Sequence, residues 1–418
     1  MENREVFVWL SSKNEDMLVG KLWFHYRNGR ESASFEYDKK WLKNPDHFAL
    51  EPALQLTEGA THTAAGKHLF GAIEDSAPDR WGRVLMRRAA KAAGVSGTLM
   101  EADYLLGVND EARLGALRFS EKIGGEFLAA SNVTAIPPFV DLPKLLNATN
   151  KFLENSETAN DLRFLLAPGS SLGGARPKAT VRDKNGELAI AKFPRKDDEF
   201  KVEMWEATAL SLAEKSRINV PKWRLEMILD KPVLIMKRFD RNKSERLPFL
   251  SAMSMLDAKD GDARSYIEIA DALAIYGSAP DVDMPQLWRR MVFNILVSNT
   301  DDHLRNHGFL YEKKNGWRLS PAYDLNPVPQ EIKPRVLETA ITFDDFTADI
   351  DAALSVAKYF QLTQQDAKNI VGEVAAITRN WRNTAKTIGL NNRDIERMAS
   401  AFEHKDLENA IKMSSSIL

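Results

Sequence analysis

One stretch limits the possible folds of this chain more than any other: a strongly apolar helix that runs directly into a polar loop. Within residues 285–297, large apolar side chains recur at helical spacing, namely Leu287, Trp288, Met291, Val292, Ile295 and Leu296. A face this wide has to be buried, so we expect the helix to lie inside a packed domain. The polar residues 298–308 follow it at once. A buried helix therefore ends at a loop rich in reactive side chains.

The loop and the residues after it have an order that suits phosphoryl transfer. Asp301 is followed by Asn306, then by a predicted hairpin over residues 309–319, and then by Asp324. Transfer from ATP needs a carboxylate that accepts the proton of the attacking hydroxyl, and oxygen ligands that hold Mg²⁺. Each of these residues alone is more typical of a turn. The helix before the loop and the hairpin after it make the combination specific.

A lysine for the phosphates is predicted at the end of a strand. Residues 189–192, Ala-Ile-Ala-Lys, resemble the strand signature of kinases. Alternation places Lys192 on the same face as Ile190, where a charge is costly unless a partner or a phosphate meets it. The helix predicted over residues 197–217 offers Glu203 and Glu206 as partners. The alternative is a lysine that points out to solvent.

A glycine-rich segment, residues 168–178, precedes this strand. Its adjacent Gly173 and Gly174 would let the backbone approach a phosphate closely. The segment lacks the Lys-Ser/Thr pair of a P-loop and the Gly-x-Gly-x-x-Gly pattern. By itself it is equally compatible with a flexible loop.

Hydrophobic periodicity divides the chain near residue 240. Alternation predicts strands at residues 6–10, 17–26, 32–37, 178–182, 187–193 and 233–236. Helical spacing predicts helices at residues 81–93, 349–360, 364–388 and 392–411. A first half that contains strands is thus followed by a helical second half.

Composition excludes several classes of protein. The 418 residues contain 57 Lys and Arg against 59 Asp and Glu, a net charge of −2, which argues against a protein that mainly coats nucleic acid. Without cysteine, a disulfide scaffold, a thiolate nucleophile and a Cys-ligated zinc are excluded. No apolar run has the length of a signal peptide core or a membrane span, so we expect a cytoplasmic protein without membrane contact.

The motifs together resemble the HipA family of serine/threonine kinases, the toxins of bacterial toxin–antitoxin pairs. The resemblance rests on residues 75–80, 171–178, 191–192, 238–241, 299–306 and 322–324. It implies an α+β, two-lobed protein-kinase-like fold with a β-containing N-terminal lobe and an all-helical C-terminal lobe. The expected parts are an N-terminal α/β subdomain (1–130), a nucleotide-binding part (131–240) and a catalytic lobe (241–418).

The resemblance also implies roles for individual residues. Asp301 would be the catalytic acceptor, and Asn306 and Asp324 would hold Mg²⁺. ATP would be bound by Gly173, Gly174, Ala175, Lys178, Lys192, Glu206, Lys237, Phe239, His303, Asn306, Tyr323 and Asp324. Autophosphorylation would modify Ser171 or its neighbour Ser170 and switch the enzyme off.

Partners are likewise implied by the resemblance alone. The substrate would be an aminoacyl-tRNA synthetase, with glutamyl-tRNA synthetase favoured. A helix-turn-helix antitoxin of the HipB type would hold the kinase, and operator DNA would be reached only through that antitoxin.

Three other interpretations remain open. A small-molecule kinase of the aminoglycoside or choline kinase type shares the Asp-x4-Asn arrangement. A metal-dependent hydrolase could use His303 and His307, which would suit zinc on a helix, although Leu304 stands where a zinc protease has glutamate. An inactive repressor subunit would only bind its antitoxin and DNA.

Overall fold

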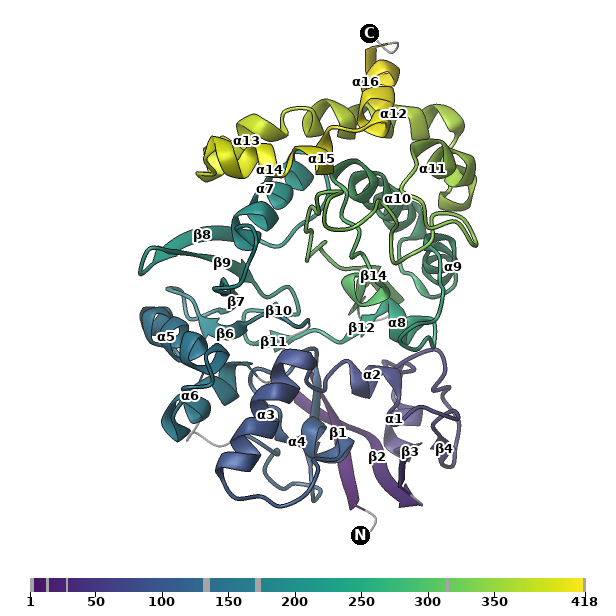
Figure 1. The fold of residues 1–418 in the computed structure, drawn as a ribbon. Helices are drawn as coiled ribbons and strands as arrows, with labels where there is room; N and C mark the ends of the chain where they lie inside the picture. Colours follow the sequence, from purple (N-terminus) through teal and green to yellow (C-terminus); the bar gives the residue numbers. More distant parts are fainter. Residues whose placement is uncertain are drawn as a thin grey trace. The chain divides into compact units, whose positions relative to one another are not determined.

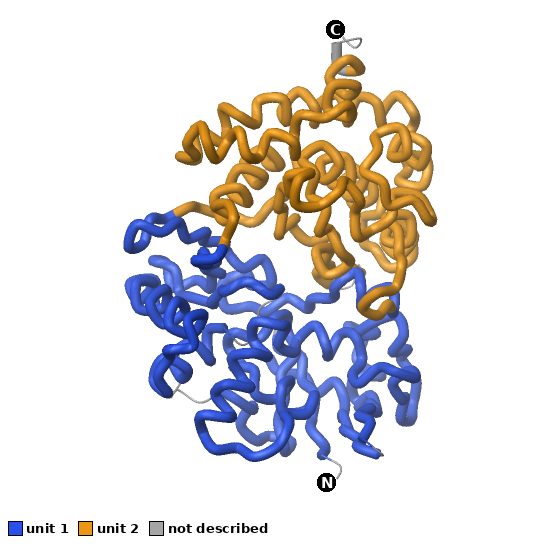
Figure 2. Tube along the Cα trace, viewed as in Figure 1, with its two compact units in different colours: residues 1–197, 226–257 blue, residues 198–225, 258–418 orange. Residues whose placement is uncertain are grey.

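The computed structural model describes residues 4–12, 15–27, 29–130, 136–169, 174–312 and 316–415. The chain forms two compact units, each built from two segments (Figure 2). Unit 1 comprises Met1–Asp197 and Glu226–Asp257, and unit 2 comprises Asp198–Leu225 and Ala258–Leu418. The predicted boundary at residue 240 lies inside unit 1.

The first sheet of unit 1 is antiparallel, in the order β4-β3-β2-β1-β5. Its strands are β1 (Arg4–Ser12), β2 (Glu15–Arg27), β3 (Arg30–Tyr37), β4 (Thr61–His62) and β5 (Leu117–Ser120). The predicted alternation is present, because Val6, Val8 and Leu10 are all buried. Gly29 has a φ of +75° at the predicted β2–β3 turn, a conformation that glycine adopts without strain. Four helices lie between β3 and β5 in the chain: α1 (Lys39–Lys43), α2 (Gly71–Glu74), α3 (Arg80–Ala92) and α4 (Glu101–Gly107).

The second sheet of unit 1 has the order β6-β7-β9-β8. Its strands are β6 (Lys178–Arg182), β7 (Leu188–Lys192), β8 (Trp223–Ile228), which crosses the unit boundary, and β9 (Lys231–Lys237). One face, which includes Ala189, Ala191 and Phe193, packs in a core with α3, α5 (Leu142–Leu153) and α6 (Ala159–Gly169). Figure 1 shows α5 and α6 beside this sheet. The β6–β7 turn forms where Asn185-Gly186 predicts it, and Gly186 has a φ of +75°.

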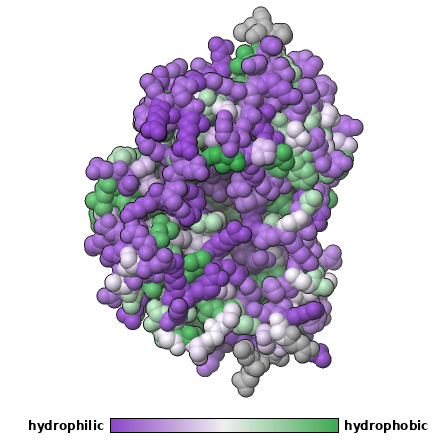
Figure 3. Space-filling view, in the orientation of Figure 1, coloured by the Kyte–Doolittle hydropathy of each residue, from purple (hydrophilic) through white to green (hydrophobic). Residues whose placement is uncertain are grey.

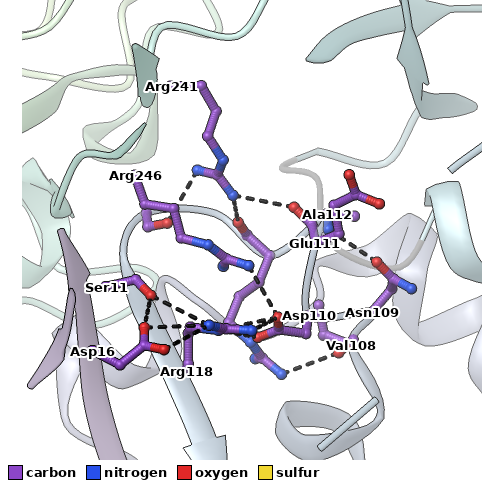
Figure 4. Close-up of polar contacts among 12 residues, drawn as sticks. Ser11, Asp16, Val108, Asn109, Asp110, Glu111, Ala112, Arg118, Arg241 and Arg246 are labelled. Carbon is purple, nitrogen blue, oxygen red and sulfur yellow. Dashed lines mark hydrogen bonds and ion pairs between the residues drawn. The ribbon is translucent and has the colours of Figure 1, made fainter. Parts of the chain in front are cut away.

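A buried cluster of arginines and aspartates connects the two sheets of unit 1 (Figure 4). Asp240 accepts hydrogen bonds from Arg238 at 2.6 and 2.8 Å and from Arg241 at 2.6 Å. Arg241 also donates to backbone carbonyls within residues 111–115, the loop that leads to β5. Burial opposes ionisation of Asp240, but the two guanidinium groups hold its pKa well below the usual range. The motif at residues 238–241 therefore fixes the packing of unit 1.

Short elements complete unit 1. They are a 3-10 turn (Phe139–Asp141), β10 (Arg241–Asn242), β11 (Glu245–Arg246), β12 (Phe249–Ser251) and α8 (Ala252–Met255).

Unit 2 is built around α10 (Pro280–Val297), whose side chains are buried from Leu287 to Val297. The helices that surround it are α7 (Val202–Lys215), α9 (Tyr266–Tyr276), α11 (Ile350–Val356), α12 (Gln364–Thr378), α13 (Trp381–Ile388), α14 (Asn392–Arg397), α15 (Ala399–Phe402) and α16 (Lys405–Ser415), with 3-10 turns at Leu304–Asn306 and Ala357–Phe360. This lobe is helical but not all-helical, because β13 (Gly308–Glu312) pairs with β14 (Gly316–Leu319). That hairpin is the one predicted for residues 309–319.

Several helix boundaries differ from the prediction. The continuous helices predicted over residues 364–388 and 392–411 are interrupted, the first at Arg379–Asn380 and the second at Met398 and Glu403–His404. Helix α7 begins at Val202 rather than near Asp197, whose carboxylate pairs with the neighbouring Arg195 at 2.9 Å.

The face of the molecule shown in Figure 3 is mostly hydrophilic, with small apolar patches between the charged groups. Among the described residues, the helices are too short or too polar to cross a lipid bilayer.

Candidate active site

The polar loop starts at a sharp change of backbone direction. Ser298 caps α10 in the left-handed conformation, with a φ of +52°. Its hydroxyl donates to the carbonyl of Ala401 at 2.7 Å, and the backbone N–H of Asn299 still donates to Asn294 at 2.9 Å. Both contacts are buried. The end of the buried helix therefore fixes the place from which the loop departs.

Asp301 and Asn306 lie at opposite ends of one short turn. The amide nitrogen Nδ2 of Asn306 donates to the backbone carbonyl of Asp301 at 3.0 Å. Asn306 is 7% exposed, whereas 68% of the Asp301 side chain is exposed. The loop thus holds the asparagine firmly and presents the aspartate carboxylate to solvent.

Asp324 approaches the same loop from the segment after the hairpin. It has a φ of +61°, a backbone conformation uncommon for residues other than glycine and enriched in Asp and Asn. Asn326 donates from its side chain to Asp324 Oδ1 at 3.3 Å and from its backbone to Asn299 Oδ1 at 3.2 Å. The hydroxyl of Tyr323 donates to the carbonyl of Arg305 at 2.7 Å. The two predicted parts of the site are therefore brought together.

The negative charge of Asp324 influences the pKa of Asp301. Partial loss of water around the Asp301 carboxyl is the largest influence and raises its pKa, while the positive charges of His303 and Lys333 lower it. The negative charges of Asp324 and Glu338 raise it further, and the net effect is a pKa above the usual range. A raised pKa makes a carboxylate a stronger base, as proton acceptance requires.

A buried network of hydrogen bonds holds the polar loop. The sequence did not predict it. Asp302 accepts hydrogen bonds from Tyr266 and, at 2.9 Å, from His307, and its carbonyl accepts one from Thr339 at 2.7 Å. Burial would raise the pKa of Asp302, but the charge and hydrogen bond of His307, with the Tyr266 hydroxyl, lower it. Tyr266 stands far from the loop in sequence, and no local pattern points to it.

The oxygen atoms of Asn306 and Asp324 suit Mg²⁺, which prefers hard oxygen ligands. Because Asn306 uses its amide nitrogen toward Asp301, its amide oxygen faces the other way. Asn326 adds a buried Oδ1 without a hydrogen-bond partner among the described residues. This donor set fits the cation.

The zinc interpretation gains no support. Residues 304–306 form one 3-10 turn rather than an α-helix, so the helical spacing of the two histidines is lost. His307 is held by Asp302 in the interior, and the buried Nδ1 of His303 makes no hydrogen bond to a described residue. Among the described residues, no three His, Cys, Asp or Glu side chains are grouped to hold a metal.

Unit 1 presents a pair of lysines on one sheet face. Lys178 of β6 lies directly opposite Lys192 of β7 in the antiparallel register, so both side chains leave the same face. Lys178 is 6% exposed, with its Nζ 3.9 Å from Asp79. Gly174 has a φ of +90°, and a Cβ there would lie 2.7 Å from that Nζ. The Lys178 ammonium group therefore lies beside a glycine backbone, and Lys192 leaves the sheet on the same face.

The other predicted ATP-binding residues have mixed surroundings. The Lys237 side chain pairs with Glu187 at 2.7 Å on the face opposite Lys192, and the ring of Phe239 contacts that of Phe249, with centroids 6.2 Å apart. Glu206 is 2% exposed on α7, in unit 2, so its pairing with Lys192 stays a prediction. Ala175 follows Gly174 in an exposed bend. Gly173, Ser170 and Ser171 lie outside the described residues.

Comparisons with known proteins agree on one family. The model of the HipA-like C-terminal domain matches residues 170–381, half of the chain, and that of the HipA N-terminal domain matches residues 8–120. Y4dM of Sinorhizobium fredii, named as a candidate kinase, is 35% identical over 95 residues, covering 22% of this chain and 23% of that protein. A candidate kinase of Haemophilus influenzae is 28% identical over 109 residues, covering 23% and 32%. The chain thus matches less than a third of the length of either relative.

A solved structure matches the whole fold. It comes from the complex of HipA, HipB and operator DNA of Shewanella oneidensis, with 16% identity, a TM-score of 0.64 and 97% of each chain covered. At this identity the likeness shows a shared fold, the two-lobed kinase-like arrangement of helices and sheets. Together with the two family models, which match in chain order, it establishes that the chain belongs to the HipA family of kinases.

Proposed function

We propose that this protein is a serine/threonine protein kinase that uses ATP and Mg²⁺. The observation that supports the proposal best is the grouping of Asp301, Asn306 and Asp324 at the end of α10. Asp301 is an exposed carboxylate with a pKa above its usual range, whereas Asn306 and Asp324 are held by neighbouring polar groups. This division of roles is the one that phosphoryl transfer needs.

In the proposed reaction, the oxygen of an acceptor hydroxyl forms a bond with the γ-phosphorus of ATP. The bond from that phosphorus to the oxygen of the β-phosphate breaks, and ADP leaves. The hydroxyl proton passes to the carboxylate of Asp301. Mg²⁺ held by Asn306 and Asp324 would supply positive charge for the phosphate oxygens.

Unit 1 supplies the proposed phosphate contacts. Lys192 and Lys178 face the same side of their sheet, so a phosphate between them would relieve their mutual repulsion. Gly173, Gly174 and Ala175 would offer backbone N–H groups. We further propose that Glu206 orients Lys192, and that backbone groups of residues 237–239 approach adenine, although the N–H of Arg238 is already bonded to Leu188 at 3.1 Å.

Regulation and partners are proposed from family membership. Phosphorylation of Ser171 or Ser170 would add a charge of about −1.5 to −2 to the glycine-rich segment and oppose ATP binding. The proposed substrate is an aminoacyl-tRNA synthetase, with glutamyl-tRNA synthetase favoured. The matched Shewanella oneidensis complex contains HipB and operator DNA, which supports an antitoxin of that type as partner and DNA contact through it.

One experiment tests these points together. The purified protein is incubated with ATP labelled on the γ-phosphate and Mg²⁺, alone and with bacterial extract, and phosphorylated residues are mapped. We expect label on Ser170 or Ser171 and on a synthetase. Label on small amino alcohols instead of protein would favour the small-molecule kinase, and absence of transfer to every acceptor would refute the kinase.

A further inference from the structure

Residues 328–340 of unit 2 form a segment that is hydrogen-bonded to the polar loop and to α10. We call this segment the strap. At its start, the backbone N–H of Val328 donates to the carbonyl of Ser298 at 3.1 Å. Arg335 donates to Ser298 Oγ at 3.1 Å and to the carbonyl of Ile295 at 3.0 Å. Near its end, Thr339 donates to the carbonyl of Asp302 at 2.7 Å. The strap is therefore hydrogen-bonded to the polar loop and to α10 on both sides of residue 333.

Lys333 projects from the strap onto the loop. Its Nζ donates to the carbonyl of Thr300 at 3.2 Å and to Glu338 Oε1 at 2.6 Å. The same nitrogen lies 3.9 Å from Asp301 Oδ1. One-third of the Lys333 side chain is exposed, so it can also meet a charged group that arrives from solvent. A cation is thus held beside the carboxylate proposed to receive the proton.

From this geometry we propose that Lys333 is a positioning residue for Asp301, and that Glu338 is its counter-charge. This inference rests on the proposed kinase function. During transfer, the hydroxyl proton moves to Asp301 while Lys333 keeps its own proton. Its charge holds the carboxylate in place until the acceptor hydroxyl binds.

The contacts of Lys333 distinguish positioning from a purely structural role. Its ammonium group meets the Thr300 carbonyl and lies beside the Asp301 carboxylate. Loss of that charge should therefore slow transfer in a protein that is still folded. If Lys333 and Glu338 only stabilised the strap, loss of either partner would appear as a loss of stability.

The experiment compares Lys333→Met, Lys333→Arg and Glu338→Gln with Lys368→Met, an exposed lysine of α12. The rate of γ-phosphate transfer from MgATP to the protein acceptor labelled in the extract is measured from pH 5 to pH 9. We expect Lys333→Met to lower kcat roughly tenfold or more, with KM for ATP changed less than about twofold. Lys333→Arg should recover much of the rate.

The comparison of rate with stability carries the decision, so the melting temperature of each variant is measured beside its rate. Lys333→Met should lose rate while its melting temperature stays close to that of wild type. If wild type transfers phosphate and Lys333→Met keeps the same rate as Lys368→Met, the proposed role of Lys333 is refuted, whereas the proposed kinase function is not. If wild type transfers none to any acceptor, both are refuted.

Discussion

Lys178 and Lys192 face each other across the β6–β7 hairpin, and their side chains leave the same face of the sheet. Like charges in directly opposite positions destabilise a sheet. Lys178 is nearly buried, which adds a desolvation cost to its charge. Such an arrangement is expected where a polyanion completes the site, and a triphosphate is the polyanion that a kinase binds.

Replacing Lys192 with Met should weaken ATP binding. A charge-assisted hydrogen bond contributes about 1.5–3 kcal/mol, which corresponds to roughly 10–100-fold in Kd. Calorimetry of MgATP binding measures this loss, with Lys231→Met at the exposed start of β9 as control. The melting temperature without ATP shows whether the variant is folded. Unchanged ATP affinity would exclude Lys192 from the phosphate site.

The neighbouring carboxylates Asp301 and Asp302 should differ strongly in how much stability the same substitution costs. Asp302→Asn leaves His307 and Tyr266 facing a neutral amide in the interior, and breaking a buried charged pair typically costs about 3–5 kcal/mol. Asp301→Asn changes an exposed side chain, for which about 0.5 kcal/mol or less is usual. Urea unfolding of both variants measures the difference. Equal loss of stability in the two variants would contradict the assignment of Asp302 to the interior and of Asp301 to the surface.

Glu51 predicts how stability depends on pH. It is 2% exposed and accepts a hydrogen bond from the backbone of Ala72. Burial, the largest cause, raises its pKa to about 8, with Asp75 and Asp257 adding to the shift and Lys67 opposing it. The folded protein therefore keeps a proton that the unfolded chain releases near its ordinary pKa of 4.5. Stability is fully present below that value and falls by about 1.4 kcal/mol per pH unit toward pH 8.

Glu51→Gln removes this dependence, since a neutral amide can still accept from Ala72. The variant should gain on wild type as the pH rises from 5 to 8, measured by denaturant unfolding at each pH. Burial also raises the pKa of Asp75, to about 6, so some decline remains below that pH. Glu58→Gln, at an exposed position, is the control. A constant difference between variant and wild type across this range would contradict the buried, protonated Glu51.

Local patterns predicted the parts of the site that chain connectivity holds together. Asp301 and Asp324 are joined by one turn and one hairpin, so their proximity follows from elements that the sequence shows. The register that opposes Lys178 to Lys192 follows in the same way from the turn at Gly186. Tertiary packing alone decides that Tyr266 reaches Asp302 and that Lys333 reaches Asp301. No periodicity or spacing records those contacts.

The boundaries of helices were likewise only partly predictable from the sequence. The apolar stripe predicted the existence of α10, but not that it begins at Pro280, where a proline suits the first turn. The break between α12 and α13 leaves the apolar pattern nearly continuous, so periodicity could not reveal it. Gly389 follows the end of α13 with a φ of +101°, a conformation that suits glycine after a helix.

The most direct measurement is the rate of labelled γ-phosphate transfer from MgATP by Asp301→Asn, beside Asp271→Asn at an exposed position of α9. Removal of the proton acceptor should lower the rate ~10²–10⁴-fold, with ATP affinity and melting temperature unchanged, while Asp271→Asn keeps the wild-type rate. A rate close to wild type in Asp301→Asn would contradict the proposed kinase site.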